Sequence, residues 1–254
     1  MFGKEYWNKK ALTNGHTGHA EPFYYCFDQQ ARLFAINELI ENNNSKKEKA
    51  LDFGCGSGDF IDILNRHYKT IYAFDISDAV IKLAKKRFNE SNIVLSDNFN
   101  QISFNKPFDL ILTVTVLQSL QKQELEETIQ TLIELLSEKG SLICMEFFRS
   151  EELTGEENQM KATINDWKNI LANNKLKIVS VHNFYNPIIE PTKSWYYYNT
   201  KLYLKILKLF KYSNFAQTKF IQVSKKIIAH HKDVILNKET AFKIYTIQKE
   251  NSCN

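Results

Sequence analysis

Residues 51–60 read LDFGCGSGDF. An apolar strand end leads into Gly54, Gly56 and Gly58, and one acid, Asp52, stands just before them. A glycine cluster between a strand and a helix is typical of a turn whose backbone approaches a nucleotide-like ligand closely. The glycines alone do not identify the ligand or the reaction, so the flanking residues are needed to distinguish the candidates.

Strand patterns and helix patterns alternate around the glycines. Continuous apolar runs at 108–116 and 141–147 are typical of parallel strands buried on both faces. Further strands are predicted at 51–53, 70–74, 93–95, 177–183 and 242–248. Helices are predicted at 28–42, 59–67, 77–89, 122–137 and 164–173. This order predicts an α/β fold, a doubly wound, mostly parallel seven-stranded sheet with helices on both faces.

The sequence divides into three predicted parts. Residues 1–27 form an N-terminal lid or substrate segment, residues 28–185 and 240–254 form the core, and residues 186–239 form a helical insert before the last strand. The insert is rich in aromatic residues and carries ten lysines against three acids. Lysines at helical spacing predict an amphipathic basic helix within it. A lid, an acceptor region, a homodimer contact and a membrane-surface contact through 195–213 all stay open.

Composition excludes several classes of protein. The 254 residues are 43% hydrophobic and 24% charged, as in an ordinary soluble globular protein. We expect a cytoplasmic protein, because no run of eighteen apolar residues occurs and the N-terminus lacks a signal-peptide core. Four scattered cysteines without CxxC spacing indicate free thiols, and no metal is expected. The basic patch contains only lysine and has no RNA-binding module beside it, so no nucleic-acid partner is expected.

Candidate ligand-binding groups follow four successive strand ends, where doubly wound sheets bind their ligands. Asp52 and the glycines end the first strand, Asp75 the second, Asp97 the third, and residues 113–118 follow the fourth. The dinucleotide fingerprint GxGxxG differs from the GxGxG spacing found here. Asp52 would also repel a diphosphate, whereas it suits the ammonium group of S-adenosylmethionine (SAM), directly or through water.

Asp52 with the three glycines resembles the E/DxGxGxG motif of the class I SAM-dependent methyltransferases. The resemblance covers about residues 48–148 and continues in FDIS around Asp75, LSDNF around Asp97 and FDLILTVTVLQSL in the fourth strand. It implies the class I methyltransferase fold, SAM as the methyl donor and S-adenosylhomocysteine (SAH) as the product.

The resemblance also implies roles for individual residues. Asp75 is similar to the acid that accepts hydrogen bonds from both ribose hydroxyls, and Asp97 to the residue that contacts the adenine amino group. The implied cofactor-binding set is Asp52, Gly54, Cys55, Gly56, Gly58, Asp75, Ile76, Asp97, Asn98, Phe99, Thr113 and Val114. Gln118 stands where many members carry histidine, which puts in doubt the base role often given to that position.

The candidate catalytic residues are His16, His19 and Glu146. The stretch NGHTGH at 14–19 places two histidines in a glycine-rich loop that can fold over the cofactor, and Glu146 ends the fifth strand. Methyl transfer from a sulfonium is an in-line displacement that mainly needs positioning. A base helps when the acceptor is a hydroxyl, and histidine titrates near neutral pH.

The acceptor is inferred by elimination and charge. No N/DPPY-like tetrapeptide follows the fourth strand, which argues against exocyclic nitrogen acceptors. The sequence therefore favours methyl transfer to an oxygen of a small polar or phosphorylated acceptor, such as a surface-polysaccharide or nucleotide-linked sugar precursor. Two alternatives stay open: a lipid or isoprenoid acceptor approached through a membrane-facing insert, and a non-catalytic interaction protein with the same fold.

Overall fold

The computed structural model describes residues 3–18, 22–148, 162–185, 214–230, 232–237, 240 and 242–250. These residues fall into two compact units. The first contains the described residues of 1–17, 43–182 and 241–254, and the second those of 18–42 and 183–240. His19 and the predicted basic helix at 195–213 lie outside the described residues.

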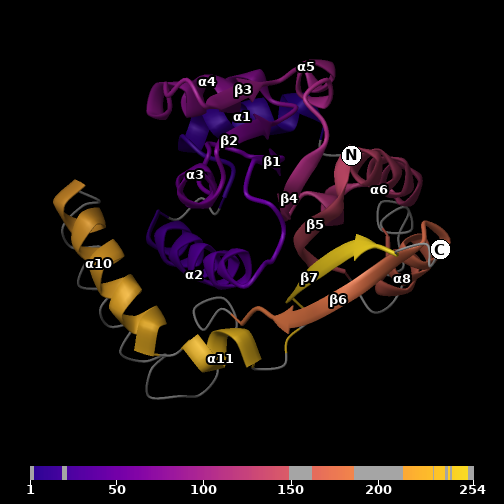
Figure 1. Ribbon diagram of the computed structural model, residues 1–254. Coiled ribbons are helices and arrows are strands. Elements are labelled where there is room, and N and C mark those ends of the chain that lie inside the picture. The colour runs from indigo at the N-terminus through magenta and orange to yellow at the C-terminus, as the bar shows by residue number, and fades with distance from the viewer. Residues whose placement is uncertain are drawn as a thin grey trace, which may run out of the picture. The chain divides into compact units, whose positions relative to one another are not determined.

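The first unit is built on a seven-stranded sheet, drawn in Figure 1, with the order β3-β2-β1-β4-β5-β7-β6. Its strands are β1 Lys49–Phe53, β2 Thr70–Phe74, β3 Ile93–Ser96, β4 Phe108–Val114, β5 Leu136–Phe147, β6 Leu176–Asn183 and β7 Phe242–Lys249. β2, β3, β4 and β5 continue the sheet in parallel from β1, and β7 runs antiparallel to β5. The predicted mostly parallel sheet is confirmed. Strand order reverses beside β1, so the expected ligand position lies at the carboxyl ends of β1 and β4.

The helices of this unit connect the strands. They are α1 Lys4–Asn14, α3 Ile61–His67, α4 Asp78–Arg87, α5 Phe99–Ser103, the short 3₁₀ helix η1 Leu117–Ser119, α6 Lys122–Leu135 and α8 Ile164–Asn173. Ser77 caps α4, because its side chain accepts a hydrogen bond from the N–H of Val80 at 3.2 Å. Gln121 and Thr163 begin α6 and α8 with capping boxes.

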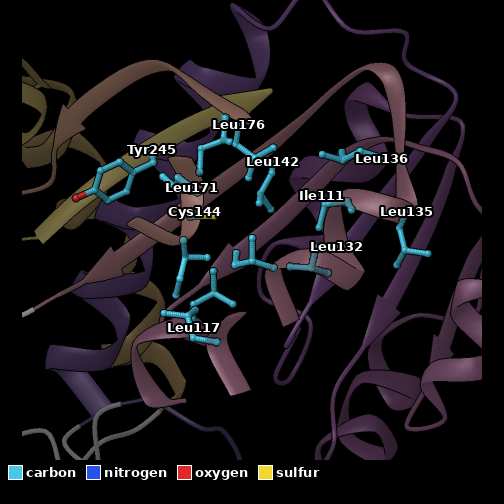
Figure 2. Close-up of a cluster of buried hydrophobic side chains, with 14 of the residues drawn as sticks. Ile111, Leu117, Leu132, Leu135, Leu136, Leu142, Cys144, Leu171, Leu176 and Tyr245 are labelled. Carbon is cyan, nitrogen blue, oxygen red and sulfur yellow. The ribbon is translucent and has the colours of Figure 1, made fainter. Parts of the chain in front are cut away.

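Both faces of the sheet are buried, as the continuous apolar runs predict. Ile111 and Leu142 face a cluster that Leu132 of α6 and Leu171 of α8 complete (Figure 2). Neighbouring residues of the same strands, such as Leu112, point to the opposite face and are also fully buried. The sheet therefore holds its strand ends rigidly, which is what a preorganised ligand site needs.

The second unit is helical. It contains α2 Pro22–Glu41, α10 Asn214–His230 and α11 Lys232–Asn237, and α2 packs against both of the others. Its interior includes Phe27 and Phe220 and the buried ion pair between Asp28 and Arg32, whose Oδ2 and Nε atoms lie 2.8 Å apart. The sequence groups residues 28–42 with the core, whereas α2 clusters with the helices of the insert. Among the described residues, no helix has the length and apolarity to cross a membrane.

Candidate active site

The glycine turn after β1 adopts backbone angles that L side chains rarely take. The φ angles of Gly54, Gly56 and Gly58 are 78°, 55° and 82°. The N–H groups of Gly54 and Cys55 both donate to the carbonyl oxygen of Phe74, at 2.7 and 2.9 Å, so the turn is attached to the end of β2. Left-handed backbone at alternate positions explains why the motif needs glycine at each of them.

The surroundings of the turn also leave little room for side chains. A Cβ atom on Gly54 would lie 2.3 Å from Cγ2 of Val116, and one on Gly58 would lie 2.7 Å from Cε2 of Phe88. On Gly56 it would lie 3.0 Å from Oγ1 of Thr17, so the segment at residues 15–17, called here the N-terminal strap, contacts the turn. The glycine turn is thus contacted by the segment after β4, by Phe88 at the C-cap of α4 and by this strap.

Gly54→Ala is expected to destabilise the protein by about 2 to 5 kcal/mol, as the sum of a left-handed backbone penalty and overpacking against Val116. Gly15→Ala is the matched control. Gly15 has nearly the same φ, 74°, but nothing lies within 4 Å of the Cβ position. The control should therefore lose only the backbone part, about 1 to 2 kcal/mol. Urea unfolding of both variants measures the difference, and equal losses would contradict the steric contribution.

Asp52 is a buried carboxylate with one unused oxygen. Its side chain is 1% exposed, and Oδ2 has no hydrogen-bond partner among the described residues. Burial, followed by the charges of Asp59 and Asp75, raises the pKa of Asp52 to about 8. A buried acceptor without a donor costs free energy, which a cationic or N–H-bearing ligand would recover.

Asp75 is held in one orientation at the end of β2. Its Oδ2 accepts a hydrogen bond from the N–H of Gly56 at 3.0 Å, and its Oδ1 accepts one from the N–H of Ser77 at 2.9 Å. Burial raises the pKa of this carboxyl group, while the two hydrogen bonds act in the opposite direction. Each carboxylate oxygen has a second acceptor position, so Asp75 retains capacity for two further donors.

The end of β3 presents a more open set of groups. Asp97 is 40% exposed at its side chain, and the amide oxygen of Asn98 accepts a hydrogen bond from the N–H of Asn100 at 3.1 Å, which caps α5. The ring of Phe99 packs edge-on against Phe53 and Phe74, with centroids 5.7 and 5.2 Å away. Ile76, after β2, is 50% exposed.

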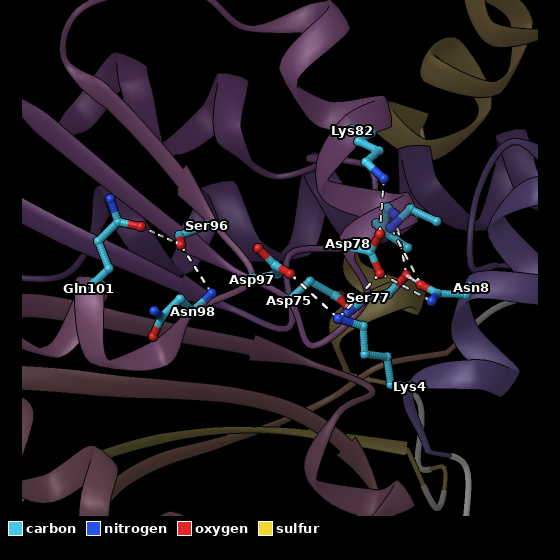
Figure 3. A network of polar contacts seen from close by, with 12 residues as sticks. Lys4, Asn8, Asp75, Ser77, Asp78, Lys82, Ser96, Asp97, Asn98 and Gln101 are labelled. Carbon is cyan, nitrogen blue, oxygen red and sulfur yellow. Dashed lines mark hydrogen bonds and ion pairs between the residues drawn. The ribbon is translucent and has the colours of Figure 1, made fainter.

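Helix α1 attaches to these strand ends through polar contacts (Figure 3). The Asn8 amide donates to Asp78 Oδ1 at 3.2 Å and accepts from the hydroxyl of Ser77. Lys4 Nζ lies 3.2 Å from Asp78 Oδ1 and 3.5 Å from Asp97 Oδ2. Lys82, Lys4 and Asn8 together lower the pKa of Asp78 to about 2. The helix before the strap is therefore anchored beside two of the strand ends that carry candidate ligand groups.

Thr113 and Val114 lie at the end of β4, and Glu146 lies on the neighbouring strand β5. Thr113 is fully buried and its hydroxyl donates to Oε1 of Glu146 at 3.1 Å, while Val114 is half-buried. Glu146 is fully buried, and burial raises its pKa to about 7. His16 is half-buried in the strap, next to Thr17. The first unit thus places His16, the glycine turn and the ends of β1 to β5 in one body.

Several contacts at the site were not predicted from the sequence. Lys4 and Asn8 lie on a helix whose only fully buried residue is Ala11, so no apolar periodicity indicated it. Arg87, in the last turn of α4, donates to the carbonyl oxygen of Ser57 and to Asp59, both at 2.9 Å. These partners lie 28 or more residues away in sequence, and no local pattern connects them.

The groups at this edge fit SAM. The unused Oδ2 of Asp52 suits the ammonium of the amino-acid portion, and the glycine turn allows close approach of backbone where any Cβ atom would collide. Asp75 retains two acceptor positions for a ribose diol. A dinucleotide would instead bring its diphosphate toward Asp52, and an ionised diphosphate has no hydrogen-bond donor for the unused Oδ2.

The fold and this site define a class I SAM-dependent methyltransferase. A family model described as a methyltransferase domain matches residues 20–186, which is more than half of the chain. The chain belongs to this family, and SAM is its cofactor. The resemblance seen in the sequence is thereby confirmed for the class of enzyme, the fold and the cofactor.

Individual relatives are similar over part of their length. The malonyl-[acyl-carrier protein] O-methyltransferase of Priestia megaterium is 28% identical over 145 residues, which cover 55% of this chain and 52% of that protein. The chain thus spans about half the length of the curated relatives it matches.

Two solved structures share the fold. Magnesium protoporphyrin IX methyltransferase of Synechocystis PCC 6803, with bound SAH, superposes with a TM-score of 0.55 at 16% identity over 72% of this chain and 92% of that one. An O-methyltransferase from a polyketide synthase of Brevibacillus brevis, in complex with SAH, gives a TM-score of 0.53 at 19% identity over 85% and 71%.

Proposed function

We propose that this enzyme transfers the methyl group of SAM to an oxygen atom of a small polar or phosphorylated acceptor, such as a surface-polysaccharide or nucleotide-linked sugar precursor. The observation that carries the SAM site is the buried Asp52 carboxylate with an unused oxygen behind three left-handed glycines. Oxygen as the accepting atom is supported by the names of two similar proteins, which are both O-methyltransferases.

An anionic or phosphorylated acceptor is supported by charge. The stretch 186–239 holds ten lysines and three acids. Within that stretch, helix α10 carries three exposed lysines, Lys219, Lys225 and Lys226. Lysine is a common binder of phosphate groups, because its ammonium acts as a compact point charge.

Each residue of the cofactor site has its own role in the proposed reaction. Bound SAM supplies an electrophilic methyl group on a sulfonium centre. Asp52 binds the ammonium. Asp75 accepts hydrogen bonds from the two ribose hydroxyls, and Asp97 accepts one from the adenine amino group. Around them, the other residues of the predicted set line the pocket: Gly54, Cys55, Gly56, Gly58, Ile76, Asn98, Phe99, Thr113 and Val114.

The acceptor oxygen needs a group that removes its proton. His16 is the candidate base, because it lies in the strap that contacts the glycine turn, and His19 three residues further on is the other candidate. An imidazole near its neutral form at pH 7 accepts a proton efficiently. The strap itself would exclude water from the reacting atoms.

Calorimetric titration tests the donor, and methyl-labelled SAM tests the acceptor. SAM and SAH should bind with micromolar affinity and NAD should not; binding of NAD alone would overturn the proposal. Label transfer is then measured with sugar phosphates and nucleotide sugars, with a malonyl thioester, and with an isoprenoid or lipid in vesicles. Transfer to one of the first group is expected. Exclusive transfer to the thioester or lipid would reject the acceptor class, and SAM binding without any transfer would favour the non-catalytic alternative.

A further inference from the structure

The carboxylate of Glu146 organises the segment that follows β4. Its Oε1 accepts hydrogen bonds from the backbone N–H groups of Val116 and Leu117, each at 3.2 Å, and its Oε2 accepts one from Gln118 at 3.1 Å. The hydroxyl of Thr113 adds a fourth donor at 3.1 Å. Three successive N–H groups that converge on one anion form a backbone nest, here at the start of η1.

This segment needs to be held, because it begins with a strained residue. Thr115 has a φ of 58°, which is costly for a β-branched side chain. Its N–H donates to the carbonyl oxygen of Met145 at 2.9 Å. Gln118 also returns a bond to β5, since its amide oxygen accepts from the N–H of Phe147 at 2.8 Å. The turn at 115–118 is therefore tied to β5 on both sides of Glu146.

The turn at 115–118 packs against the glycine turn that follows β1. The two methyl groups of Val116 lie 2.3 and 3.1 Å from the position that a Cβ atom on Gly54 would take. Asp52, two residues before Gly54, stands in register with Leu112 of β4. A movement of the turn at 115–118 would therefore displace Val116 from Gly54, next to the group that is proposed to bind the ammonium.

We propose that Glu146 is a positioning residue, which holds the turn at 115–118 so that Val116 stays against Gly54 and thereby sets the affinity for SAM. The proposal rests on the SAM site proposed above. It replaces the prediction that Glu146 acts as a base. Four donors of the protein already point at this carboxylate, three at Oε1 and one at Oε2, and Glu146 is fully buried, so it is poorly placed to reach the proton of an acceptor.

Glu146→Gln is the test, because it keeps the shape but turns one acceptor oxygen into an NH₂ donor that faces backbone N–H groups. SAH affinity should fall about tenfold, and the amide hydrogens of residues 116–118 should exchange at least about tenfold faster, while those of β1 and β2 are unchanged. In the methyl-transfer assay the loss should appear in KM for SAM, with kcat within about threefold of the parent. Glu138→Gln, an exposed glutamate of the same strand, is the matched control and should change none of these.

The opposite pattern would overturn the proposal. A base role predicts unchanged SAH affinity and amide exchange, with kcat reduced about 100-fold or more. If the parent protein does not bind SAH, the proposed SAM site is rejected. The amide exchange of residues 116–118 still tests whether Glu146 fixes the turn at 115–118. If Glu146→Gln does not fold, Gln118→Ala removes only the bond to Phe147 and should weaken SAH binding about threefold; full affinity there would also reject the proposal.

Discussion

Asp75→Ala is expected to weaken SAM and SAH binding at least about 100-fold. The carboxylate is proposed to accept hydrogen bonds from two ribose hydroxyls. Hydrogen bonds to a charged group contribute about 1.5 to 3 kcal/mol each. The variant also removes the acceptor that the N–H groups of Gly56 and Ser77 use, so the glycine turn loses a fixed point. Both effects act in the same direction, and calorimetric titration with SAH measures their sum.

A second variant separates the two effects. Asp75→Asn retains the shape and one acceptor oxygen, so it should bind SAH with an affinity between those of the parent and the alanine variant. Asp62→Ala, which removes an exposed acid on α3, should bind like the parent. Circular dichroism verifies that each variant is folded. Parent-like affinity of a folded Asp75→Ala protein would show that the ribose is held elsewhere.

Asp52→Asn should remove the pH dependence of SAM binding. The pKa of Asp52 is about 8 without ligand, so at pH 7 the carboxyl group is mostly protonated. An ammonium partner requires the ionised form. Binding should therefore release about one proton at pH 7, and affinity should rise by up to about tenfold per pH unit between pH 6 and 7.5. The asparagine variant should release no proton at this site and bind at least about tenfold more weakly at pH 7.5.

Titrations in two buffers of different ionisation enthalpy measure the released proton. The same pKa predicts an effect on stability without ligand. Because the folded state binds a proton that the unfolded state loses above about pH 4, this group lowers stability as pH rises from about 4 to about 8. Asp52→Asn should flatten that slope, and Asp62→Asn, an exposed control, should not. Equal proton release by the parent and Asp52→Asn would place the ammonium away from Asp52.

Much of the fold follows from local sequence patterns. The apolar run at 108–116 gives β4, and Ser77 caps α4 as its residue type suggests. In the first unit the α-helices α1 and α5 were not predicted, because α1 is attached by polar groups and α5 is one short turn. β5 begins at Leu136, five residues before the predicted strand at 141–147, because Phe108 of β4 pairs with it there. Pairing with a distant strand overrides local propensity.

The candidate site divides in the same way. Residues at strand ends could be found because parallel strands bring their carboxyl ends to one edge of the sheet. Their individual chemistry could not, since Asp52 and Glu146 are both buried acids but one has an unused oxygen and the other holds four donors. Those donors are 28 to 33 residues from Glu146 in sequence.

The sequence by itself identified the class of protein and its SAM cofactor, through its resemblance to the class I methyltransferases. LDFGCGSGDF and the aspartates at later strand ends are local patterns, and their spacing depends only on strand and helix geometry. The tertiary structure alone decided which partners each carboxylate meets, where α1 attaches, and that Val116 lies on Gly54. Such contacts join residues far apart in the chain, and hydrogen bonding and burial in the folded state set their energies.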